Sequence, residues 1–466
     1  MLKKASVALS FAFVSFLLAS CSTFFTDYKE PEFEKETFFK GSSRYNGSLI
    51  EENYYLAFND EKLNEIVKKA LLNNISLKSS YLNVKKALLN IDLASSDHYI
   101  DLSGSLSSSS SRHTDYHDHS VKRSSAGFSA AYQVDLFSKL EASDDAALQS
   151  FNATAYEYLA MKNTVIATTL KAYWNLAFAR QALKIAKEDL ADSETRLKLV
   201  ENKYSAGAAD SLDLDDARIN HLKVKKQLFL RVQNLKNASN ALNVLLGNTV
   251  IERIETSNLE DSSIMDFSLS VPAKLLENRP DLKKNEANLR KTYALYNKAK
   301  MDFIPDFTLK ASLSSGETDT FFRFLENPVA TLGAAVTMPF LNFNSLNIKR
   351  KQALTDIQIA ELAFVDGYIN AVSEVYDNIA ALDYCSRNLK ISEESLTLAE
   401  NNYRRYFERY QAGLVSLNDF ITSADNKRTA KINYLEAKLS RLTKSVDLIT
   451  ALGGGTSMDI QGLTNQ

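Results

Sequence analysis

The chain has 466 residues, of which 45% are apolar, and a formal net charge of −2. The apolar fraction excludes a largely disordered chain, and the balanced charge gives no indication of a nucleic-acid partner. Only six prolines and fourteen glycines interrupt the sequence, so long regular elements are expected.

The first residues, 1–20, are typical of a secretory signal. Two lysines precede an apolar run that is too short for a membrane-spanning helix. The run ends in Leu-Ala-Ser-Cys21, which resembles the lipobox of bacterial lipoproteins; an ordinary signal with a chance cysteine is the alternative. Ser22 follows, and in this resemblance the absence of Asp at that position favours the outer membrane. Several acyl chains on Cys21 would anchor the chain stably in lipid.

The sequence repeats itself over a long distance. "NKYSAGAADSLDLDDA" (202–217) and "ERYQAGLVSLNDFITS" (408–423) both read Tyr-x-Ala-Gly, with an aspartate six positions after the glycine. Residues 69–87 match residues 273–292 in the same order. We interpret this as a tandem duplication of a unit of roughly 180 residues, because a short solenoid period is absent.

Each repeat is expected to contain a helix, a β-hairpin and a long helical hairpin. The predicted segments are a signal at 1–20, a lipidated extended segment at 21–57, a first repeat at 58–247, a connector at 248–272, a second repeat at 273–453 and a tail at 454–466. The β-hairpins are placed at about 99–137 and about 303–343, with strands at 99–110, 126–137, 303–315 and 328–343, and the helical tips at about 207 and about 413.

A heptad seam predicts that the helix after the first β-hairpin is very long. From about residue 141 to 205 there is neither proline nor glycine, and small and large residues alternate at spacings of four and three. The seam residues are Ala172, Leu176, Ala179, Leu183, Ala186, Leu190, Ser193, Leu197, Val200 and Tyr204. About 65 helical residues would span roughly 97 Å, and their charged outer faces exclude this helix from a membrane.

Strands that cross a membrane must close into a barrel, because unpaired backbone groups are costly in lipid. Four strands cannot close, two chains would give eight strands with a filled interior, and three would give twelve strands with a lumen. We therefore expect a mixed α/β membrane protein, a trimer with four strands per chain in a shared 12-stranded barrel. A soluble helical protein with two surface hairpins is the alternative.

The mature chain resembles the outer-membrane factor family of TolC-like channel-tunnels, in particular the lipoprotein branch of tripartite efflux pumps. The residues that carry this resemblance are "SCSTF" (20–24), "YQVDLFSKL" (132–140), "ENRPDL" (277–282), "MPFLNFNS" (338–345) and the paired Tyr-x-Ala-Gly stretches. Two departures exist: the first copy reads Asn74-Ile-Ser where the second has Arg-Pro-Asp, and Asn342 and Asn344 stand where Asp and Gly are frequent.

The resemblance implies a homotrimeric channel-tunnel with a β-barrel in the outer membrane and coiled-coil helices forming a periplasmic α-barrel. It implies an outer-membrane exit duct that passively conducts drugs or other small solutes from periplasm to exterior. The implied partners are a periplasmic adaptor, an inner-membrane pump and outer-membrane lipid, without nucleic acid. A type I protein-secretion duct and a lipid-anchored coiled-coil scaffold without a pore are the alternatives.

Each Tyr-x-Ala-Gly stretch then lies at the tip of a helical hairpin, where a glycine can adopt positive φ without steric cost. The tip residues expected to contact the adaptor are Ala206, Gly207, Ala412, Gly413, Tyr204 and Tyr410. For the two tyrosines, a place in the helical seam is the alternative.

Three aspartates are candidates for a periplasmic gate: Asp419, Asp213 and Asp216. Asp419 stands where some relatives place an acid that faces the narrow end of the tunnel, and three copies would form a cation-attracting ring. Thr422 replaces a second gate acid, which predicts a weaker ring. The alternative is that an Asp in the first turn of a helix only favours the positive end of the helix dipole.

His113, His117 and His119 invite a metal hypothesis, but a solvated polar loop is the favoured interpretation because no converging ligand set is indicated. Phosphate-binding, serine-hydrolase and zinc-protease motifs are absent from the sequence. We therefore expect neither a metal nor another cofactor, and no enzyme activity.

Overall fold

The computed structural model describes residues 25–35, 38–39, 53–112, 121–265, 271–315 and 328–454. These residues form two compact units, each assembled from three separate stretches of chain. The first unit takes its residues from 25–33, 83–155 and 284–366, and the second from 34–82, 156–283 and 367–454.

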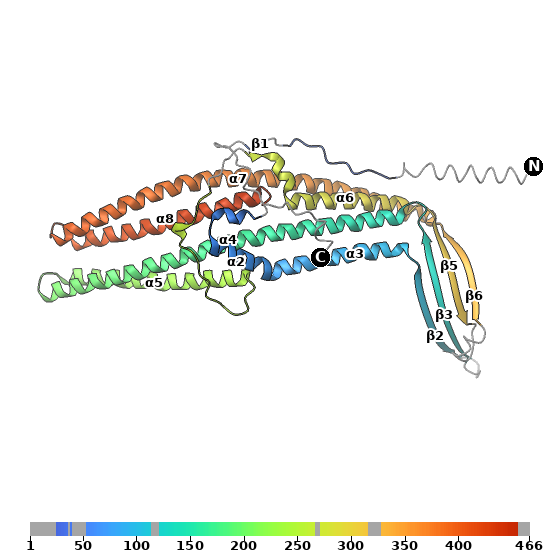
Figure 1. Cartoon of the computed structure of the whole chain (residues 1–466), viewed down its shortest axis with the longest axis horizontal. Helices are drawn as coiled ribbons and strands as arrows, with labels where there is room; N and C mark the ends of the chain where they lie inside the picture. Colours follow the sequence, from blue (N-terminus) through green and yellow to red (C-terminus); the bar gives the residue numbers. More distant parts are fainter. Residues whose placement is uncertain are drawn as a thin grey trace, which may run out of the picture. The chain divides into compact units, whose positions relative to one another are not determined.

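The first unit contains a four-stranded antiparallel sheet (Figure 1). Its strands are β2 (Asp101–Ser111), β3 (Val121–Val134), β5 (Asp306–Ser315) and β6 (Pro328–Thr337), in the order β2-β3-β5-β6. Because successive side chains point to opposite faces, Leu102, Phe128 and Leu332 share an apolar face while Ser103 and Ser129 share a polar one. Large apolar side chains on the first face are exposed in the single chain.

The four strands were predicted, but their ends were not. β3 runs from Val121 to Val134 rather than from 126 to 137, since the polar residues 122–125 pair with the serines at the end of β2. β6 ends at Thr337 rather than 343, because Pro339 opens a short 3-10 helix, η8 (Pro339–Asn342). The first and third strands begin two and three residues later than predicted, at Asp101 and Asp306.

Two helical hairpins occupy much of the second unit (Figure 1). They are formed by α4 (Lys139–Ser205) with α5 (Ser211–Leu245), and by α7 (Phe343–Gln411) with α8 (Leu417–Ala451). The first residues of α4 and α7 belong to the other unit. Within the described part of the chain, no helix combines the length and the apolar character needed to cross a membrane.

The heptad seam of α4 is buried or half-buried down to Val200. Small seam residues such as Ala179 and Ala186 are buried beside large ones such as Leu176, which allows close approach of the neighbouring helices. Tyr204 departs from the prediction, because it is 45% exposed. The buried seam therefore ends at Val200, one seam residue before Tyr204.

The helix that precedes each β-hairpin is interrupted or preceded by a short element. Before the first β-hairpin, where one helix was expected, Asn74 separates α2 (Glu61–Asn73) from α3 (Ile75–Ser95). Before the second, η6 (Ala273–Asn278) precedes α6 (Pro280–Met301), whose proline occupies the first helical position.

The largest core of the second unit surrounds Trp174 on α4. Phe58, from the 3-10 helix η3 (Tyr54–Phe58), packs edge-on against it at 4.8 Å between ring centroids. Beside it, the Tyr173 hydroxyl donates to Asp60 at 2.9 Å and accepts from the Ser257 backbone at 2.9 Å. Burial raises the pKa of Tyr173 to about 12, so this hydroxyl keeps its proton at neutral pH.

The described N-terminal stretch lies along α6 in the first unit. The side-chain amide of Asn297 forms two hydrogen bonds with the Thr26 backbone, at 2.8 and 3.1 Å. Tyr28 packs against Tyr293, and the Arg290 guanidinium lies 3.9 Å from its ring centroid. These contacts hold residues 26–28 in a defined position on the helix.

Candidate functional site

The two hairpin tips have the same backbone turn. Gly207 and Gly413 adopt φ angles of 72° and 71°, the left-handed conformation expected for a glycine after a helix. At the first tip the amide of Ala208 donates to the carbonyl of Lys203 at 2.8 Å, and at the second the amide of Leu414 donates to that of Arg409 at 2.9 Å. The expected positive φ is therefore confirmed at both glycines.

The helices that leave the tips begin differently. The side chain of Asp210 accepts the backbone amide of Asp213 at 2.8 Å, so the Asp213 carboxylate takes no part in that cap. At the second tip, Ser416 and Asp419 form a reciprocal capping box. The Asp419 amide donates to Ser416 Oγ at 3.1 Å, and the Asp419 carboxylate accepts the Ser416 amide at 3.2 Å and its hydroxyl at 2.6 Å.

Asp419 also lines a groove between α7 and α8 with a volume of about 570 Å³. Its other lining residues are Ile391, Glu394, Ser395, Leu398, Ala399, Asn402, Tyr406, Thr422, Ser423 and Asn426. The groove therefore contains two acidic side chains and no basic one. Asp213 and Asp216 are exposed on α5 and do not line it.

Aromatic stacking distinguishes the second tip from the first. The rings of Tyr410 and Phe420 stack with centroids 5.3 Å apart and planes 9° apart. Lys203, from the first hairpin, donates to the Tyr410 hydroxyl at 3.1 Å and lies over its ring. Tyr410 is thus half-buried and held by these contacts, whereas Tyr204 is 45% exposed.

The first tip is packed by aliphatic side chains instead. Val200, Leu214 and Ala217 form a small buried cluster, against which Leu417 of α8 packs. Counting from each tip glycine, Leu214 occupies the position that Phe420 occupies in the second hairpin. The two tips therefore share a backbone but differ in side-chain chemistry.

A chain of ion pairs joins the two hairpins behind the tips. Arg428 on α8 binds Asp189 on α4 at 2.5 Å and Asp425 on its own helix at 3.0 Å. Arg196, 7% exposed, lies 3.9 Å from Asp189. The sequence did not predict this network, because Asp189 and Arg428, the pair that joins the two hairpins, are 239 positions apart and each resembles an ordinary helix-surface charge.

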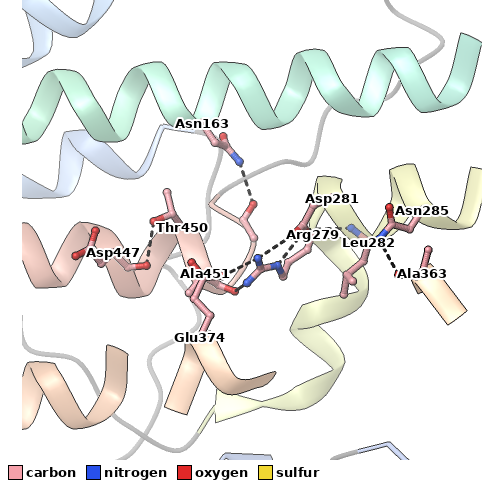
Figure 2. Close-up of polar contacts among 11 residues, drawn as sticks. Asn163, Arg279, Asp281, Leu282, Asn285, Ala363, Glu374, Asp447, Thr450 and Ala451 are labelled. Carbon is pink, nitrogen blue, oxygen red and sulfur yellow. Dashed lines mark hydrogen bonds and ion pairs between the residues drawn. The ribbon is translucent and has the colours of Figure 1, made fainter. Parts of the chain in front are cut away.

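A second polar cluster surrounds Arg279 where α8 ends (Figure 2). Arg279 Nη1 donates to the carbonyl of Ala451 at 2.7 Å, and Nη2 donates to Glu374 at 2.7 Å and to Asp281 at 2.8 Å. Asn163 donates to the carbonyl of Gly453 at 3.2 Å beside it. Arg279 thus satisfies a terminal carbonyl of α8 and complements the negative end of its dipole.

Burial and ion pairing act in opposite directions on the pKa of Asp281. Burial alone would raise this pKa, but the hydrogen bond and charge of Arg279 together hold it below its usual range. Asp281 also accepts the amide of Leu282 at 3.0 Å. The carboxylate is therefore ionised at neutral pH and keeps the arginine in place.

A family model described as outer membrane efflux protein matches residues 66–248 and 271–454 of this chain. The chain belongs to the outer membrane efflux protein family. This outer membrane efflux protein is 28% identical over 428 residues to the pyoverdine export outer membrane protein OpmQ of Pseudomonas aeruginosa, with 89% of each chain covered. It is 26% identical over 404 residues to the cation efflux system protein CusC of Escherichia coli K12, covering 85% of this chain and 88% of that one.

Solved structures show the same fold. The CmeC outer membrane channel of Campylobacter jejuni matches with a TM-score of 0.84 at 22% identity, covering 95% of this chain and 97% of that one. The open state of the MtrE outer membrane channel of Neisseria gonorrhoeae matches with a TM-score of 0.79 at 21% identity, covering 94% and 99%. The chain is thus an efflux component of the outer membrane, from a family of channel proteins rather than enzymes.

In this outer membrane efflux protein, Asn74 occupies the position in the first half of the chain that corresponds to Arg279 in the second half. Asn74 Nδ2 donates to the carbonyl of Leu245, the last residue of α5, at 2.9 Å, while its Oδ1 accepts the amide of Leu77 at 3.0 Å. The shorter side chain therefore makes the same kind of contact as Arg279 without a charge. This explains the departure from Arg-Pro-Asp noted in the sequence.

The remaining candidates lie outside the described residues. Cys21 and the three histidines of the first β-hairpin loop, His113, His117 and His119, belong to stretches that the structure does not describe.

Proposed function

We propose that this protein is the exit duct of a tripartite efflux system. Small solutes pass passively through the duct from the periplasm to the exterior. The observation that carries the proposal is the sheet, which combines one apolar face, one polar face and two edges, β2 and β6, that pair with no further strand among the described residues. Such a sheet has its backbone groups satisfied in lipid only when its edges pair with other chains.

Three copies would complete a 12-stranded barrel with a lumen. The antiparallel order within the chain supports this arrangement, since both edge strands are free to pair with β6 and β2 of neighbouring copies. Exposed apolar residues at heptad-like intervals on α7, among them Ile369, Tyr376, Tyr384, Ile391 and Leu398, support a helical barrel of several copies.

The tandem duplication and the segment boundaries given above remain our proposals. The matching tip turns support them, and so do the matching contacts that Asn74 and Arg279 make with the ends of α5 and α8.

We further propose that Cys21 is lipidated and anchors the chain in the outer membrane. The hydrogen bonds between Thr26 and Asn297 support this, because they fix the mature chain only a few residues after the cysteine.

For the periplasmic end we propose a gate at Asp419, with Asp213 and Asp216 as weaker candidates. The acidic groove around Asp419 supports the first choice. The exposed tip residues Ala206, Gly207, Ala412 and Gly413 are proposed to contact a periplasmic adaptor that links the duct to an inner-membrane pump. Tyr204 joins them, whereas the stacking of Tyr410 favours a structural role.

The relatives differ in what their names say they export. OpmQ is named for pyoverdine and CusC for cations, and a relative from Pseudomonas putida is named for toluene. We therefore propose small solutes in general. A protein-secretion duct is a second candidate, favoured by 24% identity over 447 residues to the toxin and drug export protein A of Aggregatibacter actinomycetemcomitans.

Purification in detergent, followed by electrophoresis of unheated samples and reconstitution into planar bilayers, tests the proposal. We expect a heat-dissociable trimer that conducts ions. Leu332→Asp, on the apolar face, should abolish insertion, whereas Thr331→Asp, its neighbour on the polar face, should insert normally. A monomer that forms no pore would overturn the proposal.

A further inference from the structure

Helix α5 exposes a row of large apolar side chains. Ile219, Leu222 and Phe229 are exposed in the single chain, and their spacings of three and seven place them on one side of the helix. Lys226 lies on the same side, because it is four positions after Leu222 and three before Phe229. We refer to these four residues as the α5 face.

Helix α7 exposes a similar row with the opposite charge. Ile391 and Leu398 are exposed, and Glu394 lies between them on the same side of the helix. We refer to these three residues as the α7 face. They line the groove to which Asp419 contributes from α8, and no basic side chain lines that groove.

The charges around the two faces also have opposite signs. From residue 217 to its end at 245, α5 has no acidic residue and six basic ones: Arg218, Lys223, Lys225, Lys226, Arg231 and Lys236. Between residues 391 and 400, α7 has no basic residue and three acidic ones: Glu393, Glu394 and Glu400. The two helix surfaces are therefore electrostatically complementary.

The two faces match position by position when they are counted from the hairpin tips. Fifteen, nineteen and twenty-two positions after Gly207 come Leu222, Lys226 and Phe229. Fifteen, nineteen and twenty-two positions before Gly413 come Leu398, Glu394 and Ile391. Both faces read apolar, charged, apolar. Because α5 runs away from its tip and α7 runs toward its own, the match describes an antiparallel pair of helices.

Contacts between the hairpins show that the tips lie at nearly the same level. Lys203, four positions before Gly207, donates to Tyr410, three positions before Gly413. Farther from the tips, Arg428 binds Asp189, and their distances from the two glycines differ by three positions. Three helical positions correspond to roughly 4.5 Å, which long charged side chains can span. Rotation about an axis parallel to the helices preserves this level in neighbouring copies.

The two faces do not cover each other within one chain. Leu222 is 62% exposed and Leu398 is 57% exposed, although they stand at matching positions. The ion pairs that join the hairpins involve α8 instead, with Arg428 bound to α4 and Asp425 lying 3.8 Å from Lys223 of α5. Each face is therefore available to another molecule.

We propose that the α5 face binds the α7 face of a second copy of this chain. Lys226 of one copy then supplies the base that the Asp419 groove of the next copy lacks. This inference rests on the proposed trimeric duct and assigns the helices that meet at its subunit boundary. Because the two faces differ, the contact is heterologous, and three such contacts close into a ring.

Charge fixes the register of this contact. The apolar residues supply the buried area, but a seam of leucine, isoleucine and phenylalanine alone tolerates slippage by a heptad. A slip of seven positions toward the start of α7 places Lys226 opposite Arg387 instead of Glu394, which is repulsive. Near the tips the signs are reversed, since Asp215 and Arg405 both stand eight positions from their glycines.

Cross-linking between two distinguishable chains tests the contact. We co-produce one tagged chain with Leu222→Cys and a differently tagged chain with Leu398→Cys, so that only a bond between copies can form. Mild oxidation of membranes should yield a disulfide-linked species that carries both tags. The matched control replaces Leu398→Cys by Ile369→Cys, which is exposed on the same helix but roughly 43 Å farther along it and should not cross-link. Each variant alone gives the background, since Cys385 is buried.

Charge exchange tests the register. Lys226→Glu and Glu394→Lys should each reduce the yield of heat-dissociable trimer several-fold, and the double variant should restore it. A wild-type trimer in which Leu222→Cys does not cross-link to Leu398→Cys, or in which both single charge variants assemble normally, overturns this inference alone. A wild-type protein that forms neither trimer nor pore overturns the proposed duct with it.

Discussion

Arg279 Nη1 donates a hydrogen bond of 2.7 Å to the carbonyl oxygen of Ala451, the last residue of α8. The guanidinium thereby connects the residue before α6 with the end of α8, 172 positions later. Since Arg279 is only 8% exposed, its charge is stabilised by Asp281 and Glu374 rather than by water.

Arg279→Ala should therefore destabilise the protein by about 3 kcal/mol, because it leaves a buried carbonyl and two carboxylates without their donor. Arg279→Lys keeps the charge but not the planar fork and should restore only part of the loss. Thermal unfolding followed by circular dichroism in detergent measures both. The control is Arg387→Ala, which removes a surface pair with Asp383 and should cost at most about 0.5 kcal/mol. Equal losses for Arg279→Ala and Arg387→Ala would contradict the assigned role.

Asp419→Ala should raise the open conductance or the leakage of antibiotics through the duct, if its charge closes the periplasmic end. The substitution also breaks a capping box, at a cost of about 1 kcal/mol. Ser416→Ala is the matched control, because it removes the same cap and keeps the carboxylate. Single-channel recording separates the two effects. If Ser416→Ala opens the pore as much as Asp419→Ala does, the effect arises from the helix start and not from the charge.

The lowered pKa of Asp447 should make the stability of the protein depend on pH. Burial would raise its pKa, but hydrogen bonds and charges from Lys171 and Lys444 together lower it below the ordinary value of 3.8. The folded state therefore binds the proton more weakly than the unfolded state, so the contribution is complete above about pH 4 and is lost as the pH falls through the lowered pKa. The melting temperature of Asp447→Asn should lie below that of the wild type at pH 7 and converge with it in acid. A constant difference at all pH values would refute this linkage.

Phe420→Ala should loosen the second tip specifically. Phe420 is 6% exposed and contacts Tyr403, Phe407 and Tyr410, so its truncation should cost about 3 kcal/mol. Hydrogen exchange should become faster around Gly413 and not around the first tip. Leu214→Ala, at the matching position, should produce the opposite pattern. Exchange that increases equally at both tips in either variant would argue against separate packing.

Gly207 and Gly247 both adopt positive φ, but they should differ in their tolerance of an added methyl group. A Cβ added to Gly207 would meet no atom within 4 Å, so Gly207→Ala should cost only the left-handed strain of about 1 kcal/mol. A Cβ on Gly247 would lie 2.6 Å from the carbonyl oxygen of Asn73, which requires the backbone to move. Gly247→Ala should therefore destabilise the protein clearly more than Gly207→Ala in the same thermal assay, and the reverse order would be inconsistent with these contacts.

The features that the sequence predicted well depend on local pattern. The absence of proline and glycine before Tyr204 predicted a very long helix, and α4 has 67 residues. Alternation of apolar and polar residues predicted four strands. Their ends were misjudged where polarity was uniform, as at Val121, or where a proline diverted the chain, as at Pro339, because register is set by the partner strand and not by the strand itself.

The site was predictable in its backbone and not in its contacts. The glycines of both tips indicated sharp turns. The stacking of Tyr410 on Phe420 and the pairing of Asp189 with Arg428 depend on which helices become neighbours, which no local pattern encodes. "ENRPDL" was noted only as a family marker, since the partner of its arginine, Ala451, is distant in sequence.

The chemical difference between Leu214 and Phe420 has a consequence for symmetry. In a ring built from copies of this chain, aliphatic and aromatic tips would alternate. Six such tips would therefore be chemically equivalent only at every second position. A partner with identical subunits at all positions would therefore bind neighbouring tips with unequal affinity. The partner subunits would have to bind as pairs, adopt two conformations or make two kinds of contact.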